Sequence, residues 1–215
     1  VEGLADLAVH SAKDLPTEMP EGVTLAGFLP RAPANDLFVM RDGVEDPGLI
    51  ATSSPRRRAQ LKKRFPRAAW KEIRGNIQTR LRKVADGEAD ATVMARAGFY
   101  RMGIESYEGL RFEDLTLLES VPAAGQGAIG LQVRDADAEH FRGLLCEKTR
   151  QAVALERAFL AAMGGGCHSA TAAHFVDGNL HCFDESTGYR VLPVPSDIWR
   201  LGDSGLVEWA RTHVS

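Results

Sequence analysis

Arginine and lysine are concentrated between residues 51 and 90, where the sequence holds twelve of them against four Asp and Glu. This local net charge of +8 contrasts with a formal net charge of −3 for the 215-residue chain. A basic block within an acidic chain indicates a localised site for a polyanion, although a solvated helix face is an equally ordinary explanation. The block lacks the interleaved aromatic residues that stack on bases, which disfavours nucleic acid.

Hydroxyl and guanidinium groups meet at a predicted strand-to-helix turn within this block. Ser53 and Ser54 precede Pro55, which is favoured at the first position of a helix, and Ser54 is a suitable N-cap. Hydroxyls and backbone N–H groups in such a turn suit a carboxylate or phosphate. Arginine binds carboxylates through a planar, bidentate fork, although a single arginine is more often solvated. The candidate arginines are Arg56, Arg57, Arg74 and Arg80.

Two further candidate groups lie outside the block. Lys13 and Asp14 place a cation beside a carboxylate at the end of a predicted strand, where a capping role for Asp14 is the alternative. Cys167 follows three glycines after a predicted helix. An accessible thiol in that setting can be a nucleophile or an attachment point, while an inert thiol is the alternative.

Cysteine and hydropathy patterns narrow the class of protein. A zinc site built from the adjacent pairs Cys167–His168 and His181–Cys182 is disfavoured, because zinc ligands normally have wider spacings. Three cysteines are too few for a disulfide framework and favour a reducing compartment. The sequence has no apolar run of about 18 residues and no signal-peptide pattern at its start. We therefore expect no metal site, no membrane span and a cytoplasmic location.

Apolar patterning predicts strands that alternate with helices, which indicates an α/β fold with a mostly parallel sheet. The predicted strands cover residues 5–11, 37–40, 48–54, 70–76, 90–95 and 129–133. The predicted helices cover residues 55–65, 77–88, 97–104 and 149–166. Residues 172–183 are typical of a hairpin with an Asp-Gly turn, and the tail from Pro193 predicts loops before a short helix.

Six motifs in one order, within residues 5–170, resemble the porphobilinogen deaminase (hydroxymethylbilane synthase) family. They are HSAKDLP, ATSSPRRRAQL, IRGNIQTRLRKV, DATVMARAGFYRMG, PAAGQGAIGLQVR and ERAFLAAMGGGC. The resemblance implies an α/β fold with two periplasmic-binding-protein-like domains, the first incomplete, and a small α+β C-terminal domain that carries the cofactor cysteine. It implies that residues 1–29 and 123–143 are a remnant of domain 1, residues 30–122 are domain 2 and residues 144–215 are the C-terminal domain. The family begins tens of residues earlier, so we expect a missing front segment.

The resemblance also implies an activity, a deaminating transferase of tetrapyrrole and heme biosynthesis. Such enzymes join porphobilinogen units head to tail on a covalent dipyrromethane primer, release ammonia and free hydroxymethylbilane. In this chain Cys167 would hold the dipyrromethane through a thioether, and Asp14 would act as general acid and base. Each pyrrole ring carries an acetate and a propionate, which accounts for a basic cleft.

Further positions match the family's binding residues. The cofactor would contact Lys13, Ser53, Arg56, Arg57 and Gly75. The substrate would contact Ser11, Thr52, Ser54, Arg74, Arg80, Arg101 and Gln126. We expect a monomer whose partner is porphobilinogen, with neither nucleic acid nor membrane. The sequence departs from the family pattern at Pro55, in the loop after Cys167 and beyond about residue 185.

Two other functions remain open beside the one that the resemblance implies. One is a catalytically incompetent remnant that only binds a linear pyrrole or another polyanion. The other is a solute-binding protein, which shares the two-lobed architecture but has no use for Cys167.

Overall fold

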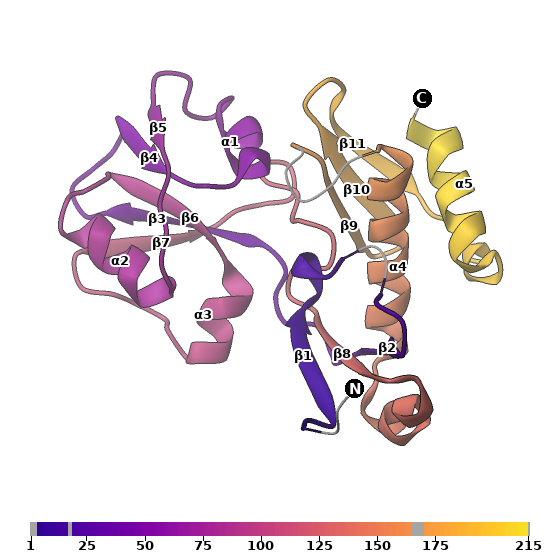
Figure 1. The fold of residues 1–215 in the computed structure, drawn as a ribbon. Coiled ribbons are helices and arrows are strands. Elements are labelled where there is room, and N and C mark those ends of the chain that lie inside the picture. Colours follow the sequence, from indigo (N-terminus) through magenta and orange to yellow (C-terminus); the bar gives the residue numbers. More distant parts are fainter. Residues whose placement is uncertain (1–3, 17–18, 165–169, 215) are drawn as a thin grey trace.

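The computed structural model describes residues 4–16, 19–164 and 170–214, and within them the strands form three sheets (Figure 1). The first lobe is a sheet in the order β1 (Leu7–Ser11), β8 (Ile129–Arg134), β2 (Val23–Phe28).

The sheet of the second lobe has the strand order β5 (Ala69–Lys71), β4 (Leu49–Ala51), β6 (Ala91–Ala95), β3 (Asp36–Arg41), β7 (Leu110–Asp114). Its helices are α1 (Pro55–Leu61), α2 (Ile77–Ala85) and α3 (Arg96–Met102). The third lobe has the order β11 (Gly188–Pro193), β10 (Asn179–Asp184), β9 (Ala172–Val176), with helices α4 (Glu147–Ala162) and α5 (Gly202–Val214). Short 3-10 segments are η1 (Ala12–Asp14), η2 (Asp135–Leu144) and η3 (Ile198–Arg200).

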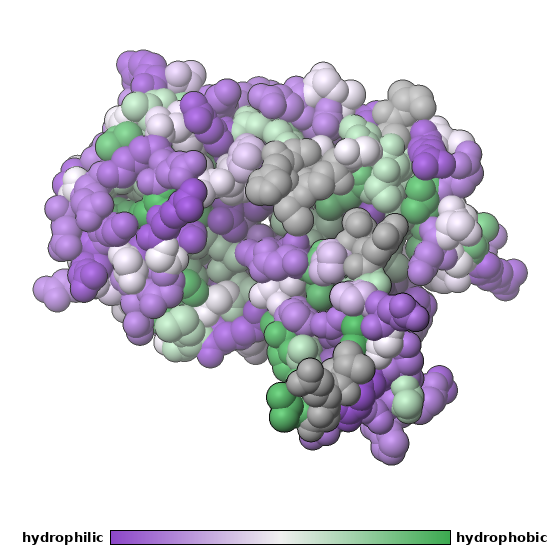
Figure 2. Space-filling view, viewed as in Figure 1, coloured by the Kyte–Doolittle hydropathy of each residue, from purple (hydrophilic) through white to green (hydrophobic). Residues whose placement is uncertain are grey.

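The second lobe is built on a strand with two buried faces. Leu37 and Val39 of β3 join the apolar cluster formed with α2 and α3, whereas Phe38 and Met40 join the cluster beside α1. Successive side chains of a strand point to opposite faces, so the unbroken run LFVM packs both layers of helices onto one sheet. Hydrophilic residues cover most of the visible outer face of this lobe (Figure 2).

Capping side chains start the two helices that border the site, and the cap at Ser54 is the one that the sequence predicts. The Ser54 hydroxyl accepts a hydrogen bond from the backbone N–H of Arg57 at 3.4 Å, and Pro55 opens α1. Asn76 Oδ1 accepts from the backbone N–H of Thr79 at 2.8 Å at the start of α2. These caps fix the turns that carry the predicted binding residues.

The strand directions differ from the mostly parallel sheet that we expected. Among the described strands, β4 is parallel to β5 and to β6, and α1 and α2 form the crossovers between β4, β5 and β6. In contrast, β3 is antiparallel to both β6 and β7, and the sheets of the first and third lobes are antiparallel throughout. Within the sheet of the second lobe the prediction was wrong for β3 alone, because no helix lies between β3 and β4 to form a crossover. Strand β7 is antiparallel to β3 and so runs in the same direction as β4, β5 and β6, and α3 precedes it in the chain.

The third lobe has more regular structure than its sequence predicts. The expected hairpin is confirmed, with Asp177 and Gly178 both at positive φ in its turn, but a third strand, β11, pairs with β10. Residues of α4 and α5 cover one face of this sheet, with Leu155, Phe159 and Leu206 among the buried side chains. Within the described residues, no helix is both long enough and apolar enough to cross a membrane.

The chain passes between the first and second lobes twice, and these two crossings lie side by side. Residues 29–35 form the outgoing crossing and residues 115–128 the returning one. The backbone N–H of Ala32 donates to the carbonyl of Gly127 at 3.0 Å. Gly127 has φ +83°, and a Cβ at this position would lie 2.5 Å from the carbonyl oxygen of Ala32. Glycine is therefore required where the crossings approach each other.

Glu156 of α4 ties the third lobe to both crossings. Its fully buried carboxylate accepts two hydrogen bonds from Arg31 of the outgoing crossing, at 2.6 and 3.0 Å, and one from the backbone N–H of Gly125 on the returning crossing, at 2.7 Å. The backbone N–H of Phe175 donates to it at 2.9 Å, and His174 Nδ1 lies 3.2 Å away. Burial acts to raise the pKa of Glu156, but Arg31 and His174 outweigh it and lower the pKa to about 2.

We predict that Gly127→Ala destabilises the chain by about 3 kcal/mol, because alanine adds a steric clash to the cost of a positive φ. Gly43→Ala is the matched control, since Gly43 has φ +77° but no atom within 4 Å of the added Cβ, and it should cost only about 1 kcal/mol. Urea unfolding of both variants measures the difference. Equal losses would show that the crossings do not constrain this position.

We also predict that Glu156→Gln removes about 3 kcal/mol of stability at pH 7, because the lowered pKa of Glu156 is a folding contribution. A depressed carboxylate pKa stabilises the fold above the unfolded value of 4.5, and this contribution is lost as the pH falls toward 2. Unfolding midpoints between pH 7 and pH 3 should therefore fall less steeply in Glu156→Gln than in the parent chain.

The control for this measurement is Glu147→Gln on the same helix. Glu147 pairs with Arg150 on the surface, so its replacement should cost less than about 1 kcal/mol. If the two variants lost the same stability, or if the pH dependence of Glu156→Gln matched the parent, the assigned role of Glu156 would be wrong.

Candidate functional site

Two adjoining cavities lie where the second lobe faces the returning crossing and η1. The first has a volume of about 240 Å³ and the second about 340 Å³. Both are lined by Lys13, Arg57, Arg80 and Gln126, so the two cavities share a wall of three cationic side chains and one amide. A shared basic wall between two small chambers suits a ligand that carries several carboxylates.

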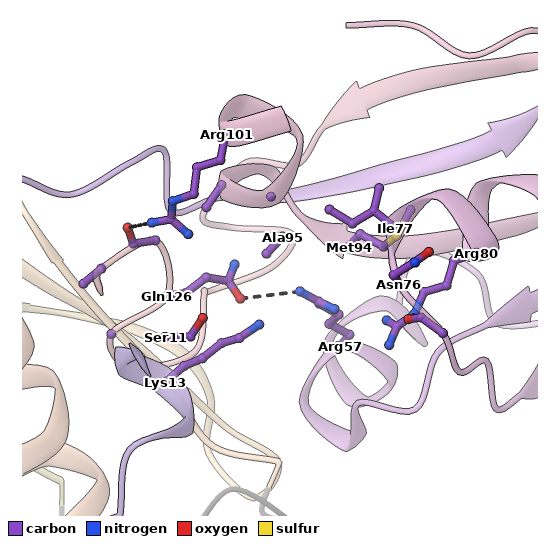
Figure 3. Close-up of a pocket in the computed structure, with 16 residues that line it drawn as sticks. Ser11, Lys13, Arg57, Asn76, Ile77, Arg80, Met94, Ala95, Arg101 and Gln126 are labelled. Carbon is purple, nitrogen blue, oxygen red and sulfur yellow. Dashed lines mark hydrogen bonds between the residues drawn. The ribbon is translucent and has the colours of Figure 1, made fainter. Parts of the chain in front are cut away.

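The first cavity has a basic side and an apolar side (Figure 3). Lys13, Arg57, Arg80 and Arg101 supply its cationic groups, and Figure 3 shows the amine of Lys13 pointing toward the guanidinium of Arg57. Its apolar lining includes Ile77, Met94, Ala95 and Ala97, from α2, β6 and α3. This combination suits the flat apolar body of a ring together with its acidic substituents.

The second cavity is formed around the turn between β4 and α1. Thr52, Ser53 and Ser54 line it, together with Asp14 and Arg56. The Ser53 hydroxyl donates to the carbonyl of Ile73 at 2.9 Å, and Thr52 Oγ1 accepts from the backbone N–H of Ser54 at 3.2 Å. The hydroxyls therefore also hold the turn in shape.

Burial, together with the nearby charge of Arg57, lowers the pKa of Lys13 and of Arg80. Asp14 acts in the opposite direction on the pKa of Lys13. A carboxylate that entered either cavity would relieve this repulsion, so the site favours anionic ligands.

Asp14 ends η1 and lies next to Lys13, with an exposed side chain at the second cavity. The carboxylate of Asp14 is therefore placed where it can contact a molecule bound in the second cavity, which general acid–base chemistry requires. Leu160 and Thr171 line the same cavity, and in the sequence they stand on either side of Cys167. Cys167 itself lies outside the described residues.

The structure gathers most of the predicted site residues but not all of them. In the first cavity are Ser11, Lys13, Arg57, Gly75, Arg80, Arg101 and Gln126. In the second are Lys13, Asp14, Thr52, Ser53, Ser54, Arg56, Arg57, Arg80 and Gln126. Arg74 lines neither cavity; its side chain is 84% exposed and pairs with Glu72 at 3.2 Å. Of the two cavities, Gly75 lines only the first.

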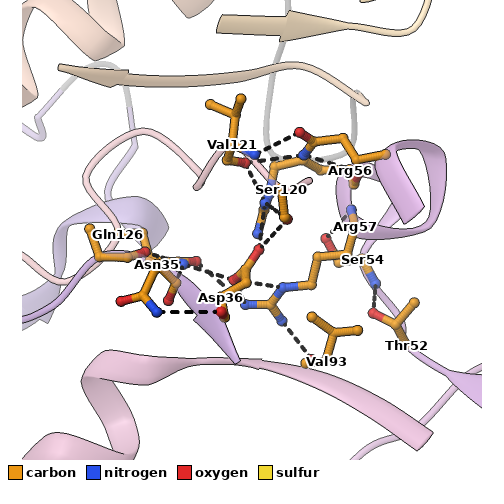
Figure 4. A network of polar contacts seen from close by, with 12 residues as sticks. Asn35, Asp36, Thr52, Ser54, Arg56, Arg57, Val93, Ser120, Val121 and Gln126 are labelled. Atoms are coloured by element: carbon orange, nitrogen blue, oxygen red, sulfur yellow. Dashed lines mark hydrogen bonds and ion pairs between the residues drawn. The ribbon is translucent and has the colours of Figure 1, made fainter. Parts of the chain in front are cut away.

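Two of the predicted arginines, Arg56 and Arg57, share one buried protein carboxylate as a partner (Figure 4). Arg56 Nη1 lies 2.8 Å from Asp36 Oδ2, and Arg57 Nε and Nη2 lie 3.0 and 2.7 Å from Asp36 Oδ1. Asp36 has no exposed surface. Burial acts to raise its pKa, but Arg56 and Arg57 outweigh it and hold the pKa of Asp36 well below its usual range.

Asp36 and Glu156 are buried carboxylates beside the site that the sequence analysis missed. The sequence could have indicated both carboxylates, because each one lies within or beside a pattern of apolar residues that predicts a buried position. Asp36 directly precedes the run LFVM, and Glu156 occupies the buried helix face that also carries Val153 and Phe159. A charge within a buried pattern needs a buried partner. Among the described residues, no group of three or more His, Cys, Asp and Glu could hold a metal ion.

Known proteins match the chain over most of its length. Residues 1–142 match the family model described as "Porphobilinogen deaminase, dipyromethane cofactor binding domain". A porphobilinogen deaminase of Chromobacterium violaceum is 42% identical over 192 residues, which cover 84% of this chain and 60% of that protein. One of Rubrobacter xylanophilus is 45% identical over 184 residues, covering 82% and 59%. The chain thus spans about 60% of the length of these relatives.

Among solved structures, the periplasmic VFT2 domain of Bordetella pertussis BvgS is similar to the chain with a TM-score of 0.39. The two are 18% identical, and the similarity covers 64% of this chain and 58% of that domain.

Proposed function

We propose, from the premise that the chain belongs to the porphobilinogen deaminase family, that it carries the deaminase reaction of its longer relatives. The reaction is the stepwise, head-to-tail condensation of porphobilinogen onto a covalent dipyrromethane primer. Each addition releases ammonia, and the final product is hydroxymethylbilane, a precursor of tetrapyrroles and heme. In this proposal the protein is a cytoplasmic monomer with porphobilinogen as its small-molecule partner.

The observation that carries this proposal is the basic wall shared by two cavities beside Asp14. Each pyrrole ring of the substrate and of the primer bears an acetate and a propionate, so a dipyrrole presents four carboxylates. Lys13, Arg57 and Arg80 can reach carboxylates in either chamber. Arg101 donates to the carbonyl of Gly127 at 2.7 Å while it lines the first cavity, and its remaining N–H groups are suited to the substrate.

The second cavity fits the dipyrromethane primer. Its hydroxyls and cations match the carboxylates of a dipyrrole, and Leu160 and Thr171 line it close in sequence to Cys167. Lys13, Ser53, Arg56 and Arg57 would hold the primer, which would be attached through a thioether to Cys167. The bound dipyrromethane supplies the nucleophilic pyrrole carbon to which the next unit is added.

In this proposal the first cavity receives porphobilinogen, and its apolar wall excludes water from one face of the ring. Asp14 donates a proton to the leaving amine of porphobilinogen, so that nitrogen departs as ammonia. The carboxylate that results then faces the positive charge that develops on the substrate. When the new carbon–carbon bond has formed, the same carboxylate accepts the proton that the attacking pyrrole carbon loses, which restores Asp14.

The family assignment also supports a division into domains. We propose that residues 1–29 and 123–143 belong to one domain, residues 30–122 to a second and residues 144–215 to the one that carries the cofactor. The first two would have the periplasmic-binding-protein-like form. The three sheets and the paired crossings of the chain are compatible with this division.

We predict that the purified chain carries an added mass equal to one dipyrromethane and that Cys167→Ser abolishes it, because the thioether requires this sulfur. Intact-mass spectrometry under denaturing conditions measures both. Cys146→Ser is the matched control, since hydrogen bonds from Thr149 lower the pKa of the Cys146 thiol and make it the reactive cysteine to exclude. A bare mass, even after extension of the chain to the length of its relatives, would overturn the proposal.

We predict that Asp14→Asn keeps the added mass but lowers the rate of porphobilinogen consumption by at least about 100-fold, the usual effect of losing a general acid and base. The control is Asp6→Asn, another exposed carboxylate of the first lobe, which pairs with Arg134 at 3.4 Å outside both cavities. Rates are compared with the parent in a version extended to the length of the relatives. An Asp14→Asn rate close to that of the parent would remove Asp14 from the mechanism.

A further inference from the structure

Asp36 has more hydrogen-bond donors around it than an ordinary ion pair requires. In addition to Arg56 and Arg57, Ser120 donates to Oδ2 at 2.8 Å and Gln126 donates to Oδ1 at 2.8 Å. The donors come from α1 of the second lobe and from the returning crossing, and Asp36 itself begins β3 at the end of the outgoing crossing. A buried carboxylate with this many donors fixes the position of every group that points at it.

Arg57 is the donor through which this arrangement reaches the cavities. Its Nε and Nη2 bind Asp36, its Nη1 donates to the carbonyl of Val93 at 3.1 Å, and Nη2 lies 3.4 Å from Gln126 Oε1. The arginine is only 7% exposed, yet it lines both cavities. The exposed edge of the Arg57 guanidinium is thus held in one position. Because the side chain is already fixed, it loses no conformational entropy when a ligand binds.

Asp36 also supports the charge of the shared wall. Arg56 and Arg57 are adjacent cations in a buried setting, which would repel each other without a carboxylate between them. Both arginines act to lower the pKa of Lys13, and Asp36 acts to raise it. Asp36 therefore favours the charged form of Lys13, a residue that lines both cavities.

We propose that Asp36 is a positioning residue of the carboxylate-binding site, which acts through Arg57 and sets the affinity of both cavities for pyrrole carboxylates. This inference rests on the proposed function, because it assumes that pyrrole carboxylates are the ligands. It assigns to Asp36 a role in binding that goes beyond holding the second lobe together.

The test measures binding apart from covalent attachment. Cys167→Ser serves as the parent, and the probe is a free dipyrromethane with acetate and propionate on each ring, titrated by calorimetry. Asp36→Asn should raise the dissociation constant about tenfold or more, the effect of losing one charge-assisted hydrogen bond. Circular dichroism and the melting temperature show whether each variant is folded under the conditions of the titration.

Asp90→Asn is the matched control. Asp90 accepts from Arg41 at 2.9 Å and from two backbone N–H groups, and it lies just before β6, at the opposite end of that strand from the pairing of Asp36 with Ala95. It should lower the melting temperature but leave the dissociation constant within about twofold of the parent, because it contacts neither cavity.

A double-mutant cycle distinguishes positioning from a general loss of stability. Arg57→Lys should weaken binding in the parent but add little in the Asp36→Asn background, because Asp36 acts through Arg57. If Asp36→Asn does not fold, Asp36→Glu replaces it in the test. This variant keeps the negative charge but displaces the guanidinium of Arg57, so it should also raise the dissociation constant.

Each outcome decides a different claim. A folded Asp36→Asn or Asp36→Glu variant that binds the probe as tightly as the parent would overturn the positioning role and leave the proposed function intact. Additive effects in the cycle would also overturn it. A parent that does not bind the probe would overturn both the proposed function and the inference.

Discussion

The ion pair between Arg31 and Glu156 is the interaction on which the placement of the lobes depends. One buried carboxylate receives a side chain of the outgoing crossing and the backbone N–H of Gly125 on the returning crossing. The helix that carries it also supplies Leu160 to the second cavity. Buried ion pairs are often no more stabilising than apolar contacts of the same size, but they demand one geometry. Here the geometry fixes Leu160, which lines the second cavity, relative to the outgoing and the returning crossing.

The basic block of residues 51–90 divides into groups with different roles. Arg56 and Arg57 are buried and shared with Asp36, so much of their charge is compensated within the protein. Others form surface pairs, such as Arg67 with Asp46 at 2.6 Å, and contribute mainly to solvation. Arg80 lies between these groups, because its Nε donates to the carbonyl of Gly75 while the side chain lines both cavities. The positive charge available to a ligand is therefore smaller than the net charge of +8 for residues 51–90 suggests. It is also confined to the few side chains that line the cavities.

Local patterns in the sequence were sufficient for most elements and for part of the lining of the cavities, whereas the family resemblance was needed for Ser11, Thr52, Gly75, Arg101 and Gln126. The caps at Ser54 and Asn76 and the apolar runs of β3 and β6 depend on neighbouring residues, so a single sequence contains them. Strands β2, β7 and β11 were missed because their exposed or half-buried residues give no continuous apolar run. The pairing of Arg31 with Glu156 spans 125 positions. No local pattern specifies such a partner, and only the path of the two crossings brings it close.

The paired crossings also determine how the cavities can change shape. Lys13 and Asp14 belong to the first lobe, whereas Arg57 and Arg80 belong to the second, and the chain joins these lobes through two adjacent segments. Because the connections are two and adjacent, they restrict separation of the lobes more than they restrict rotation about the line of the crossings. Rotation would change the distance from Lys13 to Arg57 and leave the contacts between Arg57 and Asp36 unchanged, since both belong to the same lobe. The space between Lys13 and Arg57 therefore depends on the angle between the lobes, whereas the position of Arg57 relative to Asp36 does not.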